Sequence, residues 1–512
     1  MPRTHDDNAT DACRPLTRPD PFGSRAVRPW FALSTSIALL GMPDAQGSGL
    51  QADISEGASC EGDPCCEVYD SRSEATVASD TLLPWTPPHC GKPPSLRPIP
   101  RETKPCESPE YWPYSIASAR RPVIVHYRSP IERETALKAI KYLDTAWTFE
   151  IGTLGFSAPL PDAGFCGPND AFDVYLWRGH VQCWVDEIAG APSNAWGGRM
   201  SYMLLDPWGK YGRDILRQTI GHELNHSAHA TDHWEAPQSA MEMTATYVEQ
   251  SYGDALGYNI KDFQERPEYS WLWLDLDPDG NMKTYFMYGS ALYLYFLRDR
   301  YFQDEPGFAA GIWRALRMDE RGERLSFVES LDAVLAAKGA SFSESAVAFA
   351  RWRYYAGSRD DGQHFTTWPI PYDQLPFLAE SDLNLDGTLT FTGAATRYAI
   401  QRPPMVLGSV YVDIIAAQPD MTSFEVAMDA PAVPGADWVV QAVPGLNETS
   451  DGDLIDLSGG TARVSFAAHG EGRRRTLIFS LIPTVSYDPL VRDTPAVFPY
   501  YDTYPFSIGL KP

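Results

Sequence analysis

The chain has 512 residues, and its 42 Lys and Arg against 67 Asp and Glu give a formal net charge of −25. At roughly 100–200 residues per domain, this length predicts two to three domains, and a hydrophobic content of 44% is enough for packed cores. Because a strongly acidic chain repels phosphate, we expect neither nucleic acid nor an anionic membrane surface as a partner.

Residues 1–47 have the pattern of a secretory signal peptide. Arg25 and Arg28 precede the apolar stretch from Trp30 to Met42, and small residues follow around Ala45. This stretch falls short of the roughly 20 apolar residues that span a bilayer, so an anchor is the weaker interpretation. We therefore expect a secreted protein, extracellular or periplasmic, without stable membrane insertion.

Residues 48–118 are rich in Cys and Pro and are predicted to form a linker, a propeptide or a small module held together by disulfides. Seven of the eight Cys follow the expected signal peptide, which favours disulfides in an exported chain. A Cys-type zinc cluster is disfavoured because the adjacent Cys65 and Cys66 match no usual ligand spacing. Cys166 and Cys183 are expected to form a separate pair. The remaining Cys of this set are Cys60, Cys90 and Cys106.

Regular structure is predicted from about residue 122 onward. A strand at 123–127 precedes a helix that begins near Ser129-Pro130, and its apolar residues recur at spacings of three and four. Further strands are expected at 172–177 and 200–206, before a helical block at 214–356. The apolar residues of the first helix are Ala136, Ile140, Leu143 and Trp147.

The strongest chemical signal is the H-E-x-x-H sequence from His222 to His226. On a helix these two histidines are one turn apart on one face, so both can bind one zinc ion. Glu223 is offset by one residue and can act as general base beside the metal. The alternative is a solvated helix face with two hydrogen-bonded histidines.

A tetrahedral catalytic zinc needs a third protein ligand, and Glu242 is the best candidate. It begins a helix-compatible segment in which Glu249 lies at i+7 on the same face and can orient a ligand histidine. Asp232 and His233 are rival third ligands, but no Gly turns the chain after the motif. His229 shares the face of the two motif histidines and is either a further donor or a neighbour of the metal site.

Two acidic runs, at 275–280 and 382–387, match the start of a calcium loop. Neither has a Glu at loop position 12, so acidic turns are favoured over Ca²⁺ sites. Beyond residue 376 the chain changes to short β-rich runs at 410–416, 438–442 and 476–481. These runs predict an antiparallel β-sandwich over 376–512, and hence an α+β protein.

The sequence resembles the gluzincin metallopeptidases, most closely a family of secreted bacterial candidate metalloproteases. The resemblance rests on H222-E-L-N-H226, the segment E242-M-T-A-T-Y-V-E249 and Y288-G-S-A-L-Y-L-Y-F-L297, and covers about 120–360. It implies a zincin-like metallopeptidase domain at 119–375, with a mixed sheet followed by a mainly helical part. It also implies zinc bound by His222, His226 and Glu242, and hydrolysis of peptide bonds.

By the same resemblance, Tyr288 would donate a hydrogen bond to the oxyanion, with Tyr285 and Tyr293 as alternatives. The segment 196–202 would offer an edge strand to a peptide substrate. Met243, Tyr247 and His229 depart from the family pattern.

The expected function is thus a secreted zinc peptidase in which Glu223 removes a proton from the attacking water. One alternative is a non-catalytic, secreted surface- or glycan-binding protein with a structural zinc site. A glycosidase with paired carboxylates is a second alternative, although no carboxylate pair stands out. The protein or peptide substrate and the oligomeric state stay open at this stage.

Overall fold

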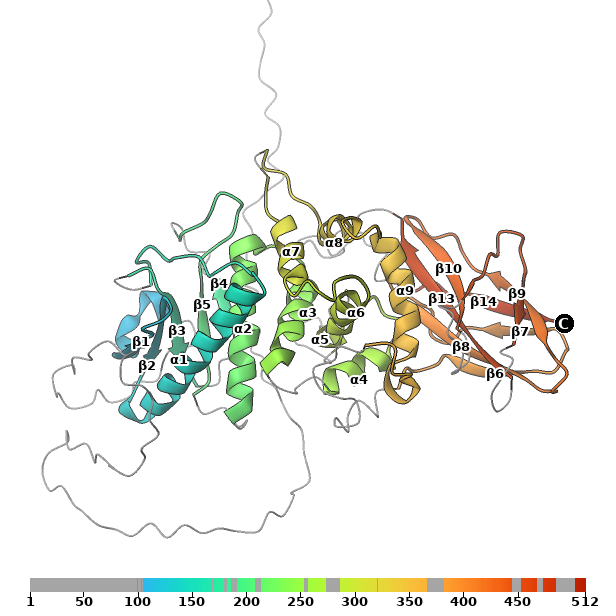
Figure 1. Ribbon diagram of the computed structural model, residues 1–512, viewed down its shortest axis with the longest axis horizontal. Helices are drawn as coiled ribbons and strands as arrows, with labels where there is room; N and C mark the ends of the chain where they lie inside the picture. Colours follow the sequence, from blue (N-terminus) through green and yellow to red (C-terminus); the bar gives the residue numbers. More distant parts are fainter. Residues whose placement is uncertain are drawn as a thin grey trace, which may run out of the picture. The chain divides into compact units, whose positions relative to one another are not determined.

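The computed structural model describes residues 99, 103, 105–166, 169–178, 182–185, 191–207, 213–252, 257–272, 286–319, 321–365, 382–443, 453–466, 473–484 and 502–512. The expected signal peptide, most of the Cys-rich segment and the acidic run at 275–280 lie outside these residues, as do Cys60, Cys65, Cys66 and Cys90. Among the helices that are described, none is long and apolar enough to cross a membrane. The described fold is of the α+β class (Figure 1).

The N-terminal sheet has five strands in the order β1-β2-β3-β5-β4. β2, β3 and β5 are parallel, and β1 and β4 pair antiparallel at the two edges. The strands predicted at 123–127, 172–177 and 200–206 are confirmed. The two edge strands, β1 and β4, were not predicted. The bounds are β1 Tyr114–Ala117, β2 Val123–Tyr127, β3 Phe172–Leu176, β4 Gln182–Val185 and β5 Ser201–Leu205.

Both faces of this sheet are covered. Helix α1 (Arg133–Trp147) packs on β1 and β2, α2 (Arg213–His233) packs on β4 and β5, and the two helices contact each other (Figure 1). On the other face, Trp112 packs with aromatic and aliphatic side chains of β3 and β5. Residues 105–117 therefore belong to this folded unit, although the sequence suggested a separate linker, propeptide or small module up to residue 118. The cluster around Trp112 contains Cys166, Tyr175, Trp177, Met200, Tyr202 and Leu204.

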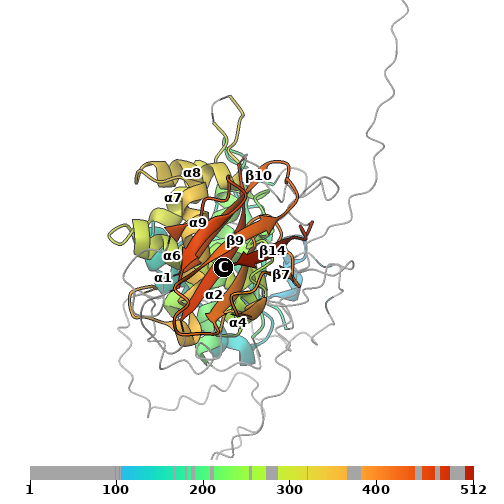
Figure 2. The ribbon, with the colours of Figure 1, turned by 90° about the vertical axis from the view of Figure 1, so that its right-hand side faces the viewer.

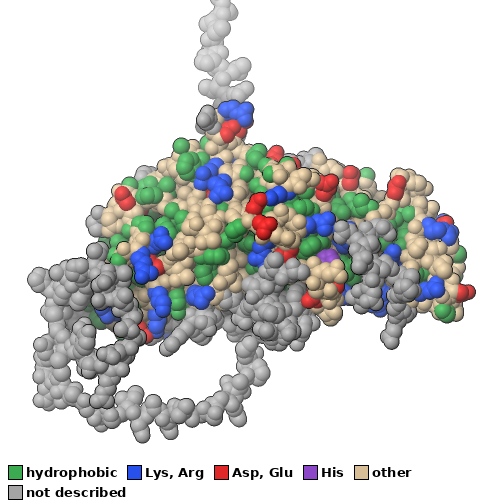
Figure 3. All heavy atoms as spheres, in the orientation of Figure 1, with side chains coloured by type: hydrophobic (Ala, Val, Ile, Leu, Met, Phe, Trp, Pro, Cys, Tyr) green, Lys and Arg blue, Asp and Glu red, His purple; other side chains and the backbone are tan. Residues whose placement is uncertain are grey.

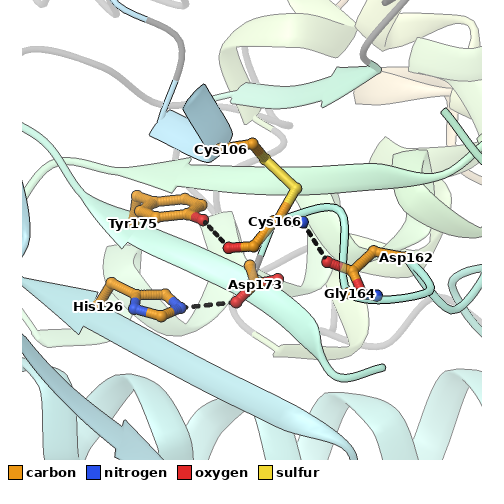
Figure 4. The surroundings of a disulfide bond; sticks show 7 residues. All are labelled: Cys106, His126, Asp162, Gly164, Cys166, Asp173 and Tyr175. Carbon is orange, nitrogen blue, oxygen red and sulfur yellow. Dashed lines mark hydrogen bonds and ion pairs between the residues drawn. A yellow bond between two sulfur atoms is a disulfide. The ribbon is translucent and has the colours of Figure 1, made fainter. Parts of the chain in front are cut away.

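A disulfide joins Cys106 to Cys166 on that same face (Figure 4). The expected pair of Cys166 with Cys183 is wrong, because Cys166 is bonded to the segment that precedes β1. Packing explains the choice of partner, since Cys106 lies against the Trp112 cluster in which Cys166 is buried. The bond closes a loop over a sequence separation of 60 residues.

The middle of the chain is helical, as predicted for 214–356. Helix α3 packs against α2 and also against α5 and α6, so it lies inside a helical layer (Figure 1). Its side chains from Ser239 to Val248 are all buried. The bounds are α3 Gln238–Glu249, α4 Gly257–Glu265, α5 Phe286–Gly289, α6 Ala291–Tyr301, α7 Phe308–Ala315, α8 Phe327–Ala336 and α9 Phe342–Tyr354, with a π-helix at Thr148–Thr153 after α1.

The C-terminal part contains two sheets that share one hydrophobic core, as expected for a β-sandwich. One sheet has the order β11-β10-β13-β8-β6 and the other β12-β9-β14-β7; β9, β14 and β7 are visible side by side in Figure 2. The pairing is antiparallel except that β6 runs parallel to β8. The bounds are β6 Gly387–Phe391, β7 Thr396–Ala399, β8 Ser409–Ala416, β9 Ser423–Asp429, β10 Ala436–Val443, β11 Asp453–Leu454, β12 Ala462–Ser465, β13 Arg474–Pro483 and β14 Ser507–Lys511.

The face in Figure 3 shows acidic and basic side chains interspersed with hydrophobic ones. Among the described residues of this face there is no continuous basic area of the kind that tracks a nucleic-acid backbone.

Candidate metal centre

Helix α2 carries the two motif histidines on one face. Its apolar positions Ile220, Leu224 and Ala228 are fully buried and recur every four residues, which holds one side of the helix against its neighbours. His222 and His226 lie on an adjacent side, one turn apart, and their Nε2 atoms are 3.0 Å from each other. Both rings thus point to a common position beside α2.

Helix α3 brings a carboxylate to the same position. The Oε2 atom of Glu242 lies 3.1 Å from His222 Nε2 and 3.4 Å from His226 Nε2. Among the described residues, these three side chains form one of two groups whose donor atoms all lie within 4.8 Å of one another. His222 and Glu242 are buried, whereas His226 is partly exposed. The structure thus brings together the three side chains that the sequence suggested as metal ligands.

The spacing of these atoms fits a zinc ion. Ligand bonds of 2.0–2.1 Å directed to the corners of a tetrahedron leave about 3.3 Å between neighbouring donor atoms. The three separations, 3.0, 3.1 and 3.4 Å, are close to that value. Two imidazole nitrogens and a carboxylate oxygen also form a donor set that zinc accepts in catalytic sites.

Glu249 orients the first histidine. Its Oε2 atom lies 3.0 Å from His222 Nδ1, so Nδ1–H donates to Glu249 and Nε2 is the ring nitrogen that would bind a metal at the common position. The two carboxylates around His222 also favour its protonated form, in which Nε2 carries a proton that a metal ion would replace. Burial alone would lower the pKa of His222, but Glu242 and Glu249 outweigh it and raise that pKa well above its usual value. For Glu242, burial alone would raise the pKa, but His226 and His222 hold it below its usual range.

Glu223 and Tyr288 complete the set of residues predicted for catalysis. Glu223 is buried on α2, next to His222 in the chain. Tyr288, on α5, is buried as well, and its ring centroid lies 5.9 Å from that of His222. Tyr293 belongs to the core instead, where its hydroxyl bonds Ser345 and its ring stacks on Trp271. Tyr285 lies outside the described residues.

The two rival metal ligands are occupied elsewhere. Asp232 Oδ1 lies 2.7 Å from Nη2 of Arg317 and accepts a hydrogen bond from Ser157. His233 Nδ1 lies 2.8 Å from Nη1 of Arg324, and burial together with that charge lowers the pKa of His233 to about 4. Without a glycine the helix continues through Asp232, which turns this carboxylate away from His222 and His226.

His229 packs between the ring of His226 and the ring of Trp313. Its ring stacks on Trp313 at a centroid distance of 3.7 Å and meets the ring of His226 edge-on at 5.6 Å. Trp313 in turn donates its indole N–H to Thr244 on α3. Burial lowers the pKa of His229 well below its usual value, so this ring is neutral. It is packed as an aromatic spacer between α2 and α7.

The predicted substrate strand at 196–202 is not at an edge, because β5 lies between β3 and β4. The two glycines of this segment serve the turn that precedes β5. Gly197 has a φ of +81°, and a Cβ on Gly198 would lie 1.7 Å from the carbonyl oxygen of Thr231. They therefore allow the segment to pack against the end of α2.

The second acidic run uses its carboxylates inside the protein. Asp386 accepts hydrogen bonds from the backbone N–H groups of Gln401 and Arg402 and from the hydroxyl of Tyr398. Asp382 accepts one from the backbone N–H of Ser358. Both carboxylates thus accept hydrogen bonds from other parts of the chain.

A buried acid next to the centre was not predicted from the sequence. Glu150 lies in the π-helix after α1, is fully buried, and accepts a hydrogen bond from Asn225 of α2. A signal was present, since Glu150 continues the buried stripe of Leu143 and Trp147, where an apolar residue is expected.

Comparisons with known proteins identify no family. No family model matches the chain, and no curated protein matches it. A solved 4-O-methyl-alpha-glucuronidase of family GH115, with specificity for decorated arabinogalactans, is 10% identical with a TM-score of 0.14. The match covers 70% of this chain and 53% of that one, so the chain spans about half of its length. A likeness at this level carries no argument about fold or function.

Proposed function

We propose that the protein is a secreted zinc-dependent peptidase with a zincin-like domain at 119–375, followed by a β-sandwich domain at 376–512. The observation that supports this proposal most directly is the meeting of His222 Nε2, His226 Nε2 and Glu242 Oε2 around one position. Glu223 follows His222 directly on the same helix and is buried. A purely structural zinc site has no need of such a base.

The chain's own residues supply the remaining chemistry. When zinc is bound, it supplies Lewis acidity that polarises a carbonyl group and makes a water molecule easier to deprotonate. Glu223 takes the proton from the attacking water and passes it to the leaving amine. Tyr288 donates a hydrogen bond to the carbonyl oxygen as negative charge develops there. Glu249 keeps the Nε2 lone pair of His222 directed at the metal position.

The experiment is a measurement of zinc content and of casein or peptide-library cleavage by the purified mature protein. We expect about one zinc per chain and cleavage that a chelator abolishes. Glu223→Gln should keep zinc and lose about 100-fold to 10,000-fold in rate. Glu134→Gln, on the exposed face of α1, is the matched control and should change neither the zinc content nor the cleavage rate.

Two results would contradict the proposal in different ways. Zinc bound without cleavage of any peptide, before or after removal of the N-terminal segment, favours the alternative of a binding protein with a structural metal. A protein that binds no zinc removes the basis of both functions.

A further inference from the structure

The candidate metal centre requires a fixed alignment of α2 and α3. His222 contacts two carboxylates of α3 at once, Glu242 through Nε2 and Glu249 through Nδ1, at 3.1 and 3.0 Å. These glutamates are seven residues apart, about two helical turns. A slide or rotation of either helix by about 1 Å would lengthen at least one contact, and functional sites tolerate only about 0.5 Å.

Glu150 contacts both the zinc-motif helix and the end of α3. Its Oε2 atom accepts a hydrogen bond from Asn225 Nδ2 at 3.2 Å, and Asn225 lies between the two motif histidines. Its Oε1 atom accepts one from the Tyr252 hydroxyl at 3.0 Å. Tyr252 follows Glu249 by three residues, in the 3₁₀ turn that continues α3. One buried carboxyl thus ties together the two elements that carry the donor atoms.

A glycine on α2 lets Tyr252 come this close. A Cβ on Gly221 would lie 2.3 Å from the Tyr252 ring, which no real contact allows. Gly221 and Asn225 are four residues apart and so share one side of α2, distinct from the side of His222 and His226. Ring packing and hydrogen bonding therefore act on the same side of the helix.

The environment of Glu150 favours a neutral carboxyl group. Burial raises the pKa of Glu150 to about 8, although the bonds from Asn225 and Tyr252 act in the opposite direction. At pH 7 the group is mostly protonated, so that it can donate as well as accept. The Tyr252 hydroxyl has a second acceptor at hand, the carbonyl oxygen of Ala146 at 3.5 Å. A glutamine can hold the same two partners, because its oxygen accepts from Asn225 and its amide N–H donates to the Tyr252 hydroxyl, which then donates to Ala146.

We infer that Glu150 is a positioning residue for the candidate metal centre, and that it sets the register of α2 and α3 through Asn225 and Tyr252. We call this set of three residues the Glu150 clamp. The inference rests on the proposed function insofar as the centre it aligns is a zinc site. None of the three residues contributes a donor atom to the metal.

The test compares Glu150→Ala and Glu150→Gln with a control at another buried carboxylate. Asp413 on β8 is 1% exposed and accepts a hydrogen bond from Thr476, but it lies in the C-terminal sheet. Zinc affinity is measured at pH 7 by competition with a chelator, and the geometry of the site by the absorption spectrum of the Co²⁺-substituted protein. Thermal unfolding monitors stability in parallel.

Glu150→Ala should weaken zinc binding about 10-fold and should alter the cobalt spectrum. This is the lower end of the roughly 10-fold to 100-fold loss of affinity that follows when a hydrogen-bond partner of a metal ligand is removed. Glu150→Gln should restore the wild-type affinity and spectrum. Asp413→Ala should lower the unfolding temperature and leave both metal readouts unchanged. The inference fails if Glu150→Ala keeps the affinity and spectrum of the wild type, or if Glu150→Gln behaves like Glu150→Ala.

A measurement on the metal-free protein separates this inference from the proposed function. Hydrogen exchange of the segments 221–226 and 247–252 should become faster in Glu150→Ala than in Glu150→Gln and Asp413→Ala. If the wild type binds zinc but cleaves nothing, the peptidase proposal fails and the zinc affinities still decide about the clamp. If it binds no zinc, the exchange rates decide, and unchanged protection in Glu150→Ala overturns the clamp.

Discussion

Among the residues that the structure describes, two groups of side chains each bring three possible metal donors within 4.8 Å of one another. One consists of His222, His226 and Glu242, and the other of Asp162, Cys166 and Asp173. Both are largely buried. They differ in whether the donor atoms are already bonded to other residues of the chain.

In the second group the donors are already engaged. Cys166 is bonded to Cys106, and Asp162 accepts hydrogen bonds from the backbone N–H groups of Gly164 and Cys166 (Figure 4). Asp173 Oδ1 lies 2.6 Å from His126 Nε2. In the first group, Glu249 contacts His222 at Nδ1, on the side of the ring away from the other donors. The Nε2 atoms of His222 and His226 both face the Glu242 carboxylate. Three donors close together therefore do not identify a metal site by themselves, and we propose that the direction of the supporting hydrogen bonds distinguishes the two groups.

The largest effect should separate the two groups directly. Glu242→Ala removes a proposed ligand and should weaken zinc binding by more than about 100-fold, beyond the loss caused by residues behind the ligands. Asp162→Ala removes hydrogen bonds to two backbone amides and should leave the zinc content unchanged. Metal analysis after dialysis against a weak chelator measures both. Loss of zinc in Asp162→Ala would mean that the second group holds the metal.

Loss of the disulfide should destabilise the protein without affecting the metal. For a loop closed over a separation of 60 residues, chain entropy predicts a loss of about 4 kcal/mol in the free energy of unfolding. Cys106→Ser combined with Cys166→Ser avoids a free thiol, and urea unfolding measures the change. Reduction of the wild type should not raise its zinc content. A second zinc bound on reduction would break the distinction between the groups.

Removal of the support behind His222 should have an intermediate effect. Glu249→Ala leaves the three proposed ligands in place but frees Nδ1 of His222, so zinc affinity should fall about 10-fold to 100-fold. Chelator competition measures the change, with Glu134→Ala as a control on an exposed carboxylate. An unchanged affinity would show that hydrogen bonds from behind do not distinguish the two groups.

An effect that builds up gradually is the pH dependence of stability due to Glu150. Its pKa is about 8 in the folded protein and about 4.5 when unfolded, so its contribution is complete below pH 4.5 and is lost as the pH rises toward 8. Relative to Glu150→Gln, the wild type should lose up to about 1.4 kcal/mol per pH unit across this window. Urea unfolding of the metal-free proteins at pH 5, 6, 7, 8 and 9 measures it. Parallel curves for the two proteins would show that Glu150 is ionised when buried.

The sequence was sufficient for the parts of the fold with a strong local pattern. The parallel strands and α1 were recognisable because apolar residues recur with period 2 or 3.6 and because Ser129-Pro130 marks the helix start. The short edge strand β1 and the partner of Cys166 were missed, because both depend on contacts between distant segments. Long-range pairing leaves no mark in local composition.

The site shows the same division. His222, His226 and Glu242 were predicted together because their chemistry requires a known spacing and a third donor. Glu150 and Tyr252 were missed because their partners lie 75 and 102 residues away in sequence. The residue type did give a hint, since a glutamate on a buried helical stripe needs hydrogen-bond partners in the fold.

The bond between Cys106 and Cys166 also makes the N-terminal part of the fold a covalent ring that contains β1, β2 and α1. A protease that cuts the backbone once inside this ring leaves two fragments joined through sulfur. The cut protein would keep its mass, apart from one added water, and would migrate as a single band until a reductant is added. Any test of maturation or self-cleavage in this protein therefore needs gels run both with and without reductant.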